Sequence, residues 1–209
     1  MAYYAYGALG TDRHPPFRSG AAWRAVGSWP CGLWECRGEV MDVLVGFATA
    51  HGSTREIAER LAAQLREAGL KAEARAMETV DDADAYRAFV LGSAVHGQAW
   101  LDPAKDFVRD NLGLLGAGPV WLFSVGMPGA LRGPGKRLAP READVIVASL
   151  PGDLSYRAHR LLSGVIARSH LPFKGRIMFR LMGGRFGDYR DWDAIDAWAA
   201  DIAAELAHR

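Results

Sequence analysis

The hydrophobic and polar positions of the chain form a regular pattern only from Met41 onward. Short continuous apolar runs alternate there with segments whose apolar residues recur every three or four positions. Continuous runs are typical of strands buried on both faces, and the wider spacing is typical of helices that bury one side. The pattern predicts strands over residues 43–47, 70–76, 89–93, 120–124 and 159–166.

Helices are predicted between and after these strands. The expected segments are a helix that ends near Ala68, a short one over 79–85, one from Asp102 to Leu112, one from Pro140 to Leu150, and a last one capped by Asp191. Residues 126–140 contain four Gly and three Pro and are predicted to form a mobile loop. Strands that alternate with helices indicate an α/β fold, with a parallel sheet covered by helices on both faces.

Residues 1–40 do not fit this pattern. They mix Gly, Pro, Arg and Trp without a period of 2 or 3.6. We interpret them as a disordered extension, or as an upstream region in front of a domain that begins at Met41. The predicted domain is therefore 41–209.

Composition and charge narrow the class of protein. The 209 residues suffice for one good domain, no apolar run approaches membrane-spanning length, and the N-terminus lacks a secretory pattern, so we expect a cytoplasmic location. A net charge of +1 gives no indication of a nucleic-acid partner. Both cysteines, Cys31 and Cys36, precede the domain, and no metal site is predicted. Nothing in the sequence indicates an oligomeric state.

The stretch from Phe47 to Thr54 carries the most specific chemistry. It reads Phe-Ala-Thr-Ala-His-Gly-Ser-Thr, between an apolar strand and an amphipathic helix. A helix start presents free N–H groups and a positive dipole, hydroxyls add donors, and Gly52 allows close approach, which suits a phosphate. The alternative is a capping box of Ser53 and Glu56, which needs no ligand.

Two further predicted strands also end in small or hydroxyl residues. These ends are Gly92-Ser93-Ala94-Val95-His96-Gly97 and Ser124-Val125-Gly126. Parallel strands end at the same edge of a sheet, where ligands bind at the point of reversed strand order. The two ends could form the walls of a slot for a flat ring.

These segments carry a family resemblance. Residues 43–65 resemble the FMN-phosphate segment of flavodoxins, and the match looks closest to the menaquinone-dependent protoporphyrinogen dehydrogenase group. That closer match rests on Gly92–Val95 with Trp100, on Phe123–Gly126, and on Gly187–Trp192. The resemblance implies a flavodoxin-like three-layer sandwich with a five-stranded parallel sheet in the order 2-1-3-4-5.

The resemblance also implies FMN as cofactor and assigns residues to it by position. Thr49, Gly52, Ser53 and Thr54 would bind the phosphate; Ala94, Val95 and His96 would lie along one side of the isoalloxazine, and Ser124 to Met127 along the other. The full expected set is Thr49, Ala50, His51, Gly52, Ser53, Thr54, Ala94, Val95, His96, Gly97, Ser124, Val125, Gly126 and Met127.

Two of these positions depart from the family pattern. His51 stands where flavodoxins usually carry threonine, and His96 stands where an aromatic side chain commonly stacks on the flavin. His51 removes one hydroxyl donor and adds a group that can be cationic. His96 is the nearest candidate for a catalytic residue.

The stretch 154–187 has seven Lys or Arg, no Asp or Glu, and interleaved large apolar residues. Such a segment can lie on an anionic membrane, here through 157–185 at the inner face, or can pair with the carboxylates of a substrate. The alternative is a solvated helix whose apolar side packs on the sheet.

Three functions remain open. The resemblance and the basic stretch favour an oxidoreductase that takes electrons from protoporphyrinogen IX or a similar donor and passes them to a quinone. The others are a soluble flavodoxin-type electron carrier, and a binding or regulatory module without flavin.

Overall fold

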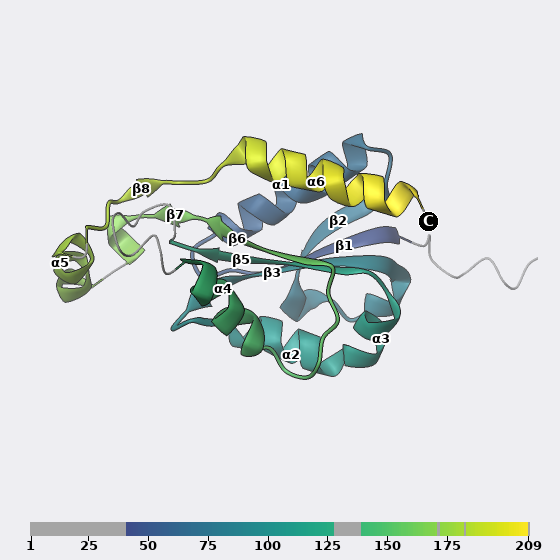
Figure 1. Cartoon of the computed structure of the whole chain (residues 1–209), viewed down its shortest axis with the longest axis horizontal. Coiled ribbons are helices and arrows are strands. Elements are labelled where there is room, and N and C mark those ends of the chain that lie inside the picture. Colours follow the sequence, from purple (N-terminus) through teal and green to yellow (C-terminus); the bar gives the residue numbers. More distant parts are fainter. Residues whose placement is uncertain (1–40, 128–138, 171, 182, 209) are drawn as a thin grey trace, which may run out of the picture. The chain divides into compact units, whose positions relative to one another are not determined.

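Five parallel strands form the central sheet in the order β2-β1-β3-β5-β6 (Figure 1). The structure is a computed structural model that describes residues 41–127, 139–170, 172–181 and 183–208. The five strands are β1 (Met41–Ala48), β2 (Ala72–Ala76), β3 (Tyr86–His96), β5 (Val120–Gly126) and β6 (Ala158–Ser163). Counted along the chain as parallel strands, their order is 2-1-3-4-5, which confirms the predicted fold. The short β4 (Ala99–Trp100) folds back antiparallel onto the end of β3.

The three inner strands explain why their sequences are nearly all apolar. β1, β3 and β5 have neighbours on both sides and helices over both faces, so consecutive side chains are buried. Gly92 lies opposite Phe123 in the register of β3 and β5. A Cβ atom at Gly92 would lie 2.0 Å from the Phe123 ring. This glycine therefore makes room for a fully buried aromatic side chain.

Two helical layers cover the sheet, as Figure 1 shows. α1 (Ser53–Glu67) and α6 (Trp192–Ala207) lie on one face; α2 (Asp102–Asp110), α3 (Leu112–Ala117) and α4 (Ala139–Ala148) lie on the other. Each face has its own core of buried apolar side chains. Arg60 on α1 also donates two hydrogen bonds, of 2.7 and 2.6 Å, to the carboxylate of Asp196 on α6.

Three predicted elements differ in detail. The segment 79–85 is not one helix. It contains the end of one 3-10 turn, η1 (Met77–Thr79), and the whole of a second, η2 (Ala83–Ala85). Leu112 begins α3 rather than ending α2. The strand predicted over 159–166 is broken at Gly164, because β7 (Val165–Ile166) leaves the sheet and pairs with β8 (Gly187–Asp188). The predictions for 1–40 lie outside the described residues, as does most of the predicted loop 126–140.

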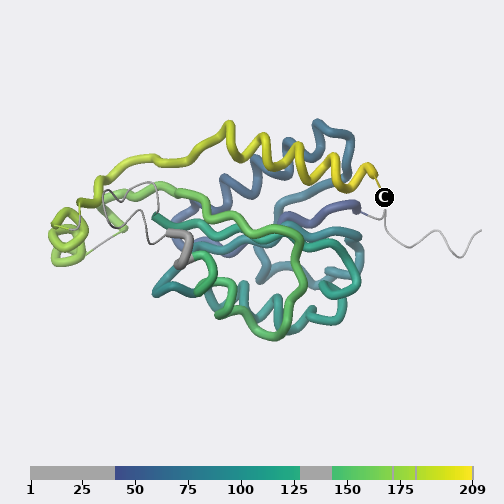
Figure 2. The backbone as a smooth tube through the Cα atoms, viewed as in Figure 1, coloured from purple at the N-terminus to yellow at the C-terminus, as the bar shows by residue number. Residues whose placement is uncertain are grey.

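The segment from β7 to β8 extends past the edge of the sheet at which the parallel strands end (Figure 2). It contains η5 (Arg168–His170) and α5 (Phe173–Leu181), with a small core of Ile166 and Phe179 against Phe186 and Tyr189. Four large apolar side chains of α5 are exposed instead: Phe173, Ile177, Met178 and Leu181. The alternative that this helix packs its apolar side on the sheet is therefore wrong.

Candidate functional site

The loop between β1 and α1 is folded around Gly52. Thr49 Oγ1 accepts a hydrogen bond of 2.9 Å from the Gly52 N–H, which closes the loop. Gly52 is the N-cap of α1 and has a φ of 93°, a left-handed conformation that glycine adopts without strain. The backbone thus turns sharply from the end of the strand into the helix.

No side chain caps the start of α1. The N-cap is Gly52 and has no side-chain hydrogen bond, so the capping box of Ser53 and Glu56 is wrong. The Glu56 carboxylate instead pairs with Arg190, which also holds Asp188. The first-turn N–H groups of α1 and the positive end of its dipole are therefore available to an anion.

Thr54 gives an independent indication of a ligand. Its side chain is fully buried, and its Oγ1 has no hydrogen-bond partner among the described residues. A buried hydroxyl without a partner costs roughly 1–3 kcal/mol. A phosphate oxygen at the helix start would satisfy this hydroxyl, so the residues present fit the phosphate of FMN.

A cavity of about 210 Å³ opens beside this loop at the edge where the parallel strands end. Its walls come from the loop between β1 and α1 and from the ends of β3, β5 and β6. We call this loop, residues 49–54, the phosphate loop. The lining residues are Ala50, His51, Ser53, Ala94, Val95, His96, Leu101, Val125, Gly126, Met127, Gly164, Val165, Ile166 and His170. Nine of the fourteen expected site residues are thus brought together here. Their small and apolar side chains suit the body of a flat ring.

The other five expected residues do not line the cavity. Thr49, Gly52 and Thr54 shape the phosphate loop, as described above. Gly97 lies in the tight turn between β3 and β4, where both Gly97 and Gln98 have positive φ. Ser124 is buried and points into the protein, away from the cavity lining.

Ser124 belongs to a buried chain of hydrogen bonds. The indole N–H of Trp100 donates to Ser124 Oγ at 2.7 Å, and His159 Nε2 lies 2.9 Å from the same oxygen. Burial lowers the pKa of His159, and the carboxylate of Asp144 opposes this shift. These hydrogen bonds connect β4, β5 and β6.

Five lining residues were not among those expected from the sequence: Leu101, Gly164, Val165, Ile166 and His170. A Cβ at Gly164 would lie 2.8 Å from Val125 Cγ1 and 3.0 Å from Ser53 Oγ, so this glycine lets the chain pass close to the phosphate loop. A glycine inside an apolar run was the available signal. No local pattern identifies His170, whose ring stacks on that of His51.

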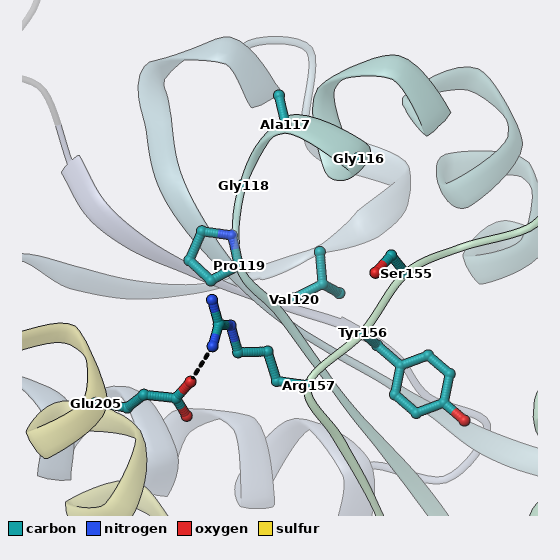
Figure 3. Close-up of a pocket in the computed structure, with 9 residues that line it drawn as sticks. All are labelled: Gly116, Ala117, Gly118, Pro119, Val120, Ser155, Tyr156, Arg157 and Glu205. Carbon is teal, nitrogen blue, oxygen red and sulfur yellow. Dashed lines mark hydrogen bonds and ion pairs between the residues drawn. The ribbon is translucent and has the colours of Figure 1, made fainter. Parts of the chain in front are cut away.

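A second hollow, of about 540 Å³, lies at the opposite end of the sheet (Figure 3). It is open and is bordered by the start of β5, by Tyr156, and by Arg157, whose guanidinium pairs with Glu205 at 2.5 Å. The two charges neutralise each other, and neither side chain is buried. Among the residues that line this hollow, none resembles the open helix start and the unpartnered hydroxyl beside the other cavity.

No group of three or more His, Cys, Asp or Glu in the part of the chain that the structure describes could hold a metal ion. No helix in the described ranges is long and apolar enough to cross a membrane.

The chain is similar to known proteins over most of its length. It is 25% identical over 181 residues to the protoporphyrinogen IX dehydrogenase [quinone] of Escherichia coli K12, a match that covers 80% of this chain and 96% of that protein. A flavodoxin structure from the domain Archaea superposes with a TM-score of 0.50, 14% identity and coverage of 80% and 100%. The Streptococcus pneumoniae TIGR4 flavodoxin gives a TM-score of 0.50, 18% identity and coverage of 78% and 98%.

The model of a protein family described as "Flavodoxin domain" matches residues 44–191, from β1 to the N-cap of α6. This match covers more than half of the chain and includes the phosphate loop and the cavity walls. The chain therefore belongs to the flavodoxin family, and its cofactor is FMN.

Proposed function

We propose that the chain is an FMN-dependent oxidoreductase that oxidises protoporphyrinogen IX or a similar donor and passes the electrons to a quinone. The E. coli relative carries this activity in its name, and the match covers nearly all of that protein. FMN supplies the redox chemistry, accepting electrons from the donor and releasing them to the acceptor. The residues of this chain bind the cofactor, position the substrate and exclude water.

The phosphate would be held by the start of α1, by Ser53 and by Thr54. The unpartnered Thr54 hydroxyl carries this assignment, because burying it is unfavourable until an acceptor arrives. The isoalloxazine would lie between Ala94, Val95 and His96 on one side and Val125 to Met127 on the other. The expected stacking of His96 on the ring remains a proposal.

The observation that favours an enzyme over a carrier is a basic groove next to the flavin cavity. The groove holds about 240 Å³ and is lined by three arginines and three apolar side chains: Arg168, Arg176, Arg180, Phe173, Ile177 and Phe186. Guanidinium groups bind carboxylates well, and the apolar walls suit the body of a large ring. The segment 165–170 lines both hollows, so a substrate bound in the groove would lie beside the flavin.

The exposed side of α5 would rest on an anionic membrane. Met178 and Leu181, which do not line the groove, are 58% and 78% exposed and lie three residues apart on the same side of the helix. No Asp or Glu occurs from 154 to 187, so the surrounding charge is positive. This combination is typical of helices that lie in the interface of an anionic bilayer. Such contact would place the protein at the inner face of the membrane, close to a membrane quinone.

The activity is tested with purified protein, protoporphyrinogen and a short-chain menaquinone analogue without vesicles. We expect turnover, and Arg180→Gln should raise the KM for the porphyrinogen about tenfold through a lost charge-assisted contact. The KM for the quinone analogue and the affinity for FMN should not change. Arg87→Gln, an exposed arginine at the start of β3, is the matched control.

Other outcomes would favour the alternatives. A yellow protein that is reduced by a reductase but ignores porphyrinogen would be an electron carrier. A colourless protein that does not bind added FMN would contradict both redox functions and leave the binding module.

Thr54→Val tests the phosphate assignment separately. Valine keeps the shape of threonine and removes the hydroxyl, so we expect FMN affinity to fall about tenfold while the stability of the FMN-free protein stays equal or rises. Thr79→Val is the control, since the Thr79 hydroxyl donates to the Ala76 carbonyl far from the cavity. Unchanged FMN affinity in Thr54→Val would contradict the assignment.

Membrane contact is tested by flotation with vesicles that contain phosphatidylglycerol. The double variant Met178→Gln, Leu181→Gln should bind at least about tenfold more weakly, because two apolar side chains no longer enter the bilayer. Val145→Gln changes an exposed apolar residue on α4 and should float like the wild type. Equal flotation of all three proteins would contradict the membrane contact.

A further inference from the structure

Two histidines from distant parts of the chain stack at the rim of the flavin cavity. His51 belongs to the phosphate loop, and His170 is the last residue of η5. Their ring centroids are 4.0 Å apart and the ring planes differ by 9°. Both side chains line the cavity together with Ser53, which begins α1. The stack therefore connects the phosphate loop to the segment that leaves the sheet after Gly164.

The His170 ring is oriented by the backbone of its own turn. The backbone N–H of Ala167 donates to His170 Nδ1 at 3.3 Å, and the backbone N–H of His170 donates to the Ala167 carbonyl at 3.1 Å. Nδ1 is therefore an acceptor without a proton. Burial, and to a lesser extent the nearby His51, lowers the pKa of His170. His170 is thus a neutral, oriented surface on which a second imidazole can stack, whether that ring is neutral or charged.

At position 51 the phosphate loop has a histidine and therefore lacks the hydroxyl donor of the family pattern. The resemblance to flavodoxins places a threonine hydroxyl there, and the Gly52 N–H is already bonded to Thr49 Oγ1. An imidazole N–H can take the place of that hydroxyl, and an imidazolium adds charge to the contact. An exposed histidine next to a glycine would otherwise sample many orientations, and ordering it on binding would cost affinity.

We propose that His51 binds the phosphate of FMN, and that His170 is the positioning residue that holds the His51 ring at the phosphate loop. The proposal rests on FMN occupying the cavity as described above. It makes the segment after Gly164 part of the phosphate site, although this segment lies far from the loop in the sequence.

The experiment compares FMN with riboflavin, which has the same ring system and no phosphate. Dissociation constants are measured with the full chain freed of cofactor, by quenching of flavin fluorescence. His51→Ala should weaken FMN binding about tenfold or more, the effect of a lost charge-assisted hydrogen bond, and leave riboflavin binding unchanged. His170→Ala should weaken FMN binding several-fold, again without an effect on riboflavin, because the His51 ring loses its support.

Two further variants separate positioning from simple packing. His170→Phe keeps a flat ring under His51 and should retain most of the FMN affinity. His51→Thr supplies the hydroxyl of the family pattern, and in this background His170→Ala should no longer weaken FMN binding. His208→Ala removes a histidine at the end of α6 and serves as the control. Thermal melting of each variant checks that it is folded.

Each outcome decides the proposal. Unchanged FMN binding by His51→Ala would show that His51 is not a phosphate ligand. Equal losses of FMN and riboflavin binding by His170→Ala would show that His170 is only a wall of the ring cavity. A wild-type protein that binds riboflavin as tightly as FMN would contradict the phosphate site itself, which is a different failure from that of the histidine pair.

Discussion

At the scale of single residues, His159 is half-buried and shares a hydrogen-bond network with Trp100 and Ser124. The Trp100 indole can only donate, so Ser124 Oγ must accept from it. The serine oxygen has a second lone pair, so it can donate to His159 Nε2 at 2.9 Å or accept from it, depending on the histidine tautomer. Burial lowers the pKa of His159, so the folded protein favours the neutral imidazole.

The preference of the folded protein for neutral His159 predicts a pH dependence of stability. A histidine whose pKa is lower in the folded than in the unfolded chain binds fewer protons when folded, so the free energy of unfolding falls as pH decreases through the histidine range. Between about pH 7.5 and 5.5, the wild type should lose more stability than His159→Gln, whose side chain does not titrate. At about pH 7.5 the variant should be less stable, by roughly 1 kcal/mol for the altered hydrogen bond.

Urea unfolding at each pH provides the measurement. The difference between the two profiles is the relevant quantity, because burial also lowers the pKa of His170. His208→Gln, a change at the exposed C-cap of α6, should keep the wild-type profile. Parallel profiles for the wild type and His159→Gln would contradict the preference for neutral His159.

The sequence was sufficient to predict the local conformations that depend on immediate neighbours. The loop from Thr49 to Thr54 was predictable because a strand, hydroxyls, a glycine and a helix follow one another directly. His170 was not predictable, since its role depends on stacking against a residue far away in the chain. Ser124 was expected to line the slot for the ring, but its side chain is buried and bonds His159, which lies on another strand and gives no local signal.

At the scale of elements, α1 and α6 lie on the same face of the sheet and begin in opposite ways. α6 is capped by Asp191, whose carboxylate accepts a hydrogen bond of 3.0 Å from the Ala194 N–H. α1 begins at a left-handed Gly52 without a side-chain cap. The helix whose start borders the cavity is the one left open. The contrast supports the view that α1 is completed by a phosphate, while α6 is complete by itself.

This contrast predicts different effects at the two helix starts. Asp191→Ala removes the cap of α6 and should destabilise the protein by about 1 kcal/mol. Asp191→Asn keeps an acceptor and should lose only a few tenths of that, because asparagine is also a good N-cap. Neither change should alter FMN affinity. Thermal or urea unfolding together with FMN titration provides the test, and equal stability losses in the two variants would contradict the capping role.

Two of the three elements that differ from the prediction share one cause. The apolar pattern of 159–166 continues through Gly164, but close packing against Val125 and Ser53 makes the chain leave the sheet there. Likewise, Leu112 continues the apolar face of α2, but the chain turns at Asn111 into a separate helix. Periodicity identifies which residues are buried, and it does not show where the chain changes direction to bury them.

At the scale of the whole described domain, the two faces of the sheet are fully used for stability and one edge is left for function. The buried cores lie under α1 and α6 on one face and under α2 to α4 on the other. The phosphate loop, the flavin cavity and the basic groove all lie at the edge where the parallel strands end. Changes at this edge can therefore alter binding with little effect on the two cores.

This arrangement leads to a prediction about residues 1–40. The family match begins at residue 44, and among the described residues the first strand begins at Met41. We propose that residues 41–209 form the complete flavodoxin-like domain.

A protein that begins at Met41 should unfold within about 2 °C of the full chain, since a difference below about 0.5 kcal/mol shifts the melting temperature by no more than this in a domain of this size. It should also bind FMN with the same dissociation constant, because the part of the cavity lining that the structure describes begins at Ala50. Thermal melting and FMN titration of the two proteins side by side provide the measurement. A shortened protein that melts several degrees lower would show that residues 1–40 contribute to the fold, and one that melts normally but binds FMN more weakly would show that they contribute to the site.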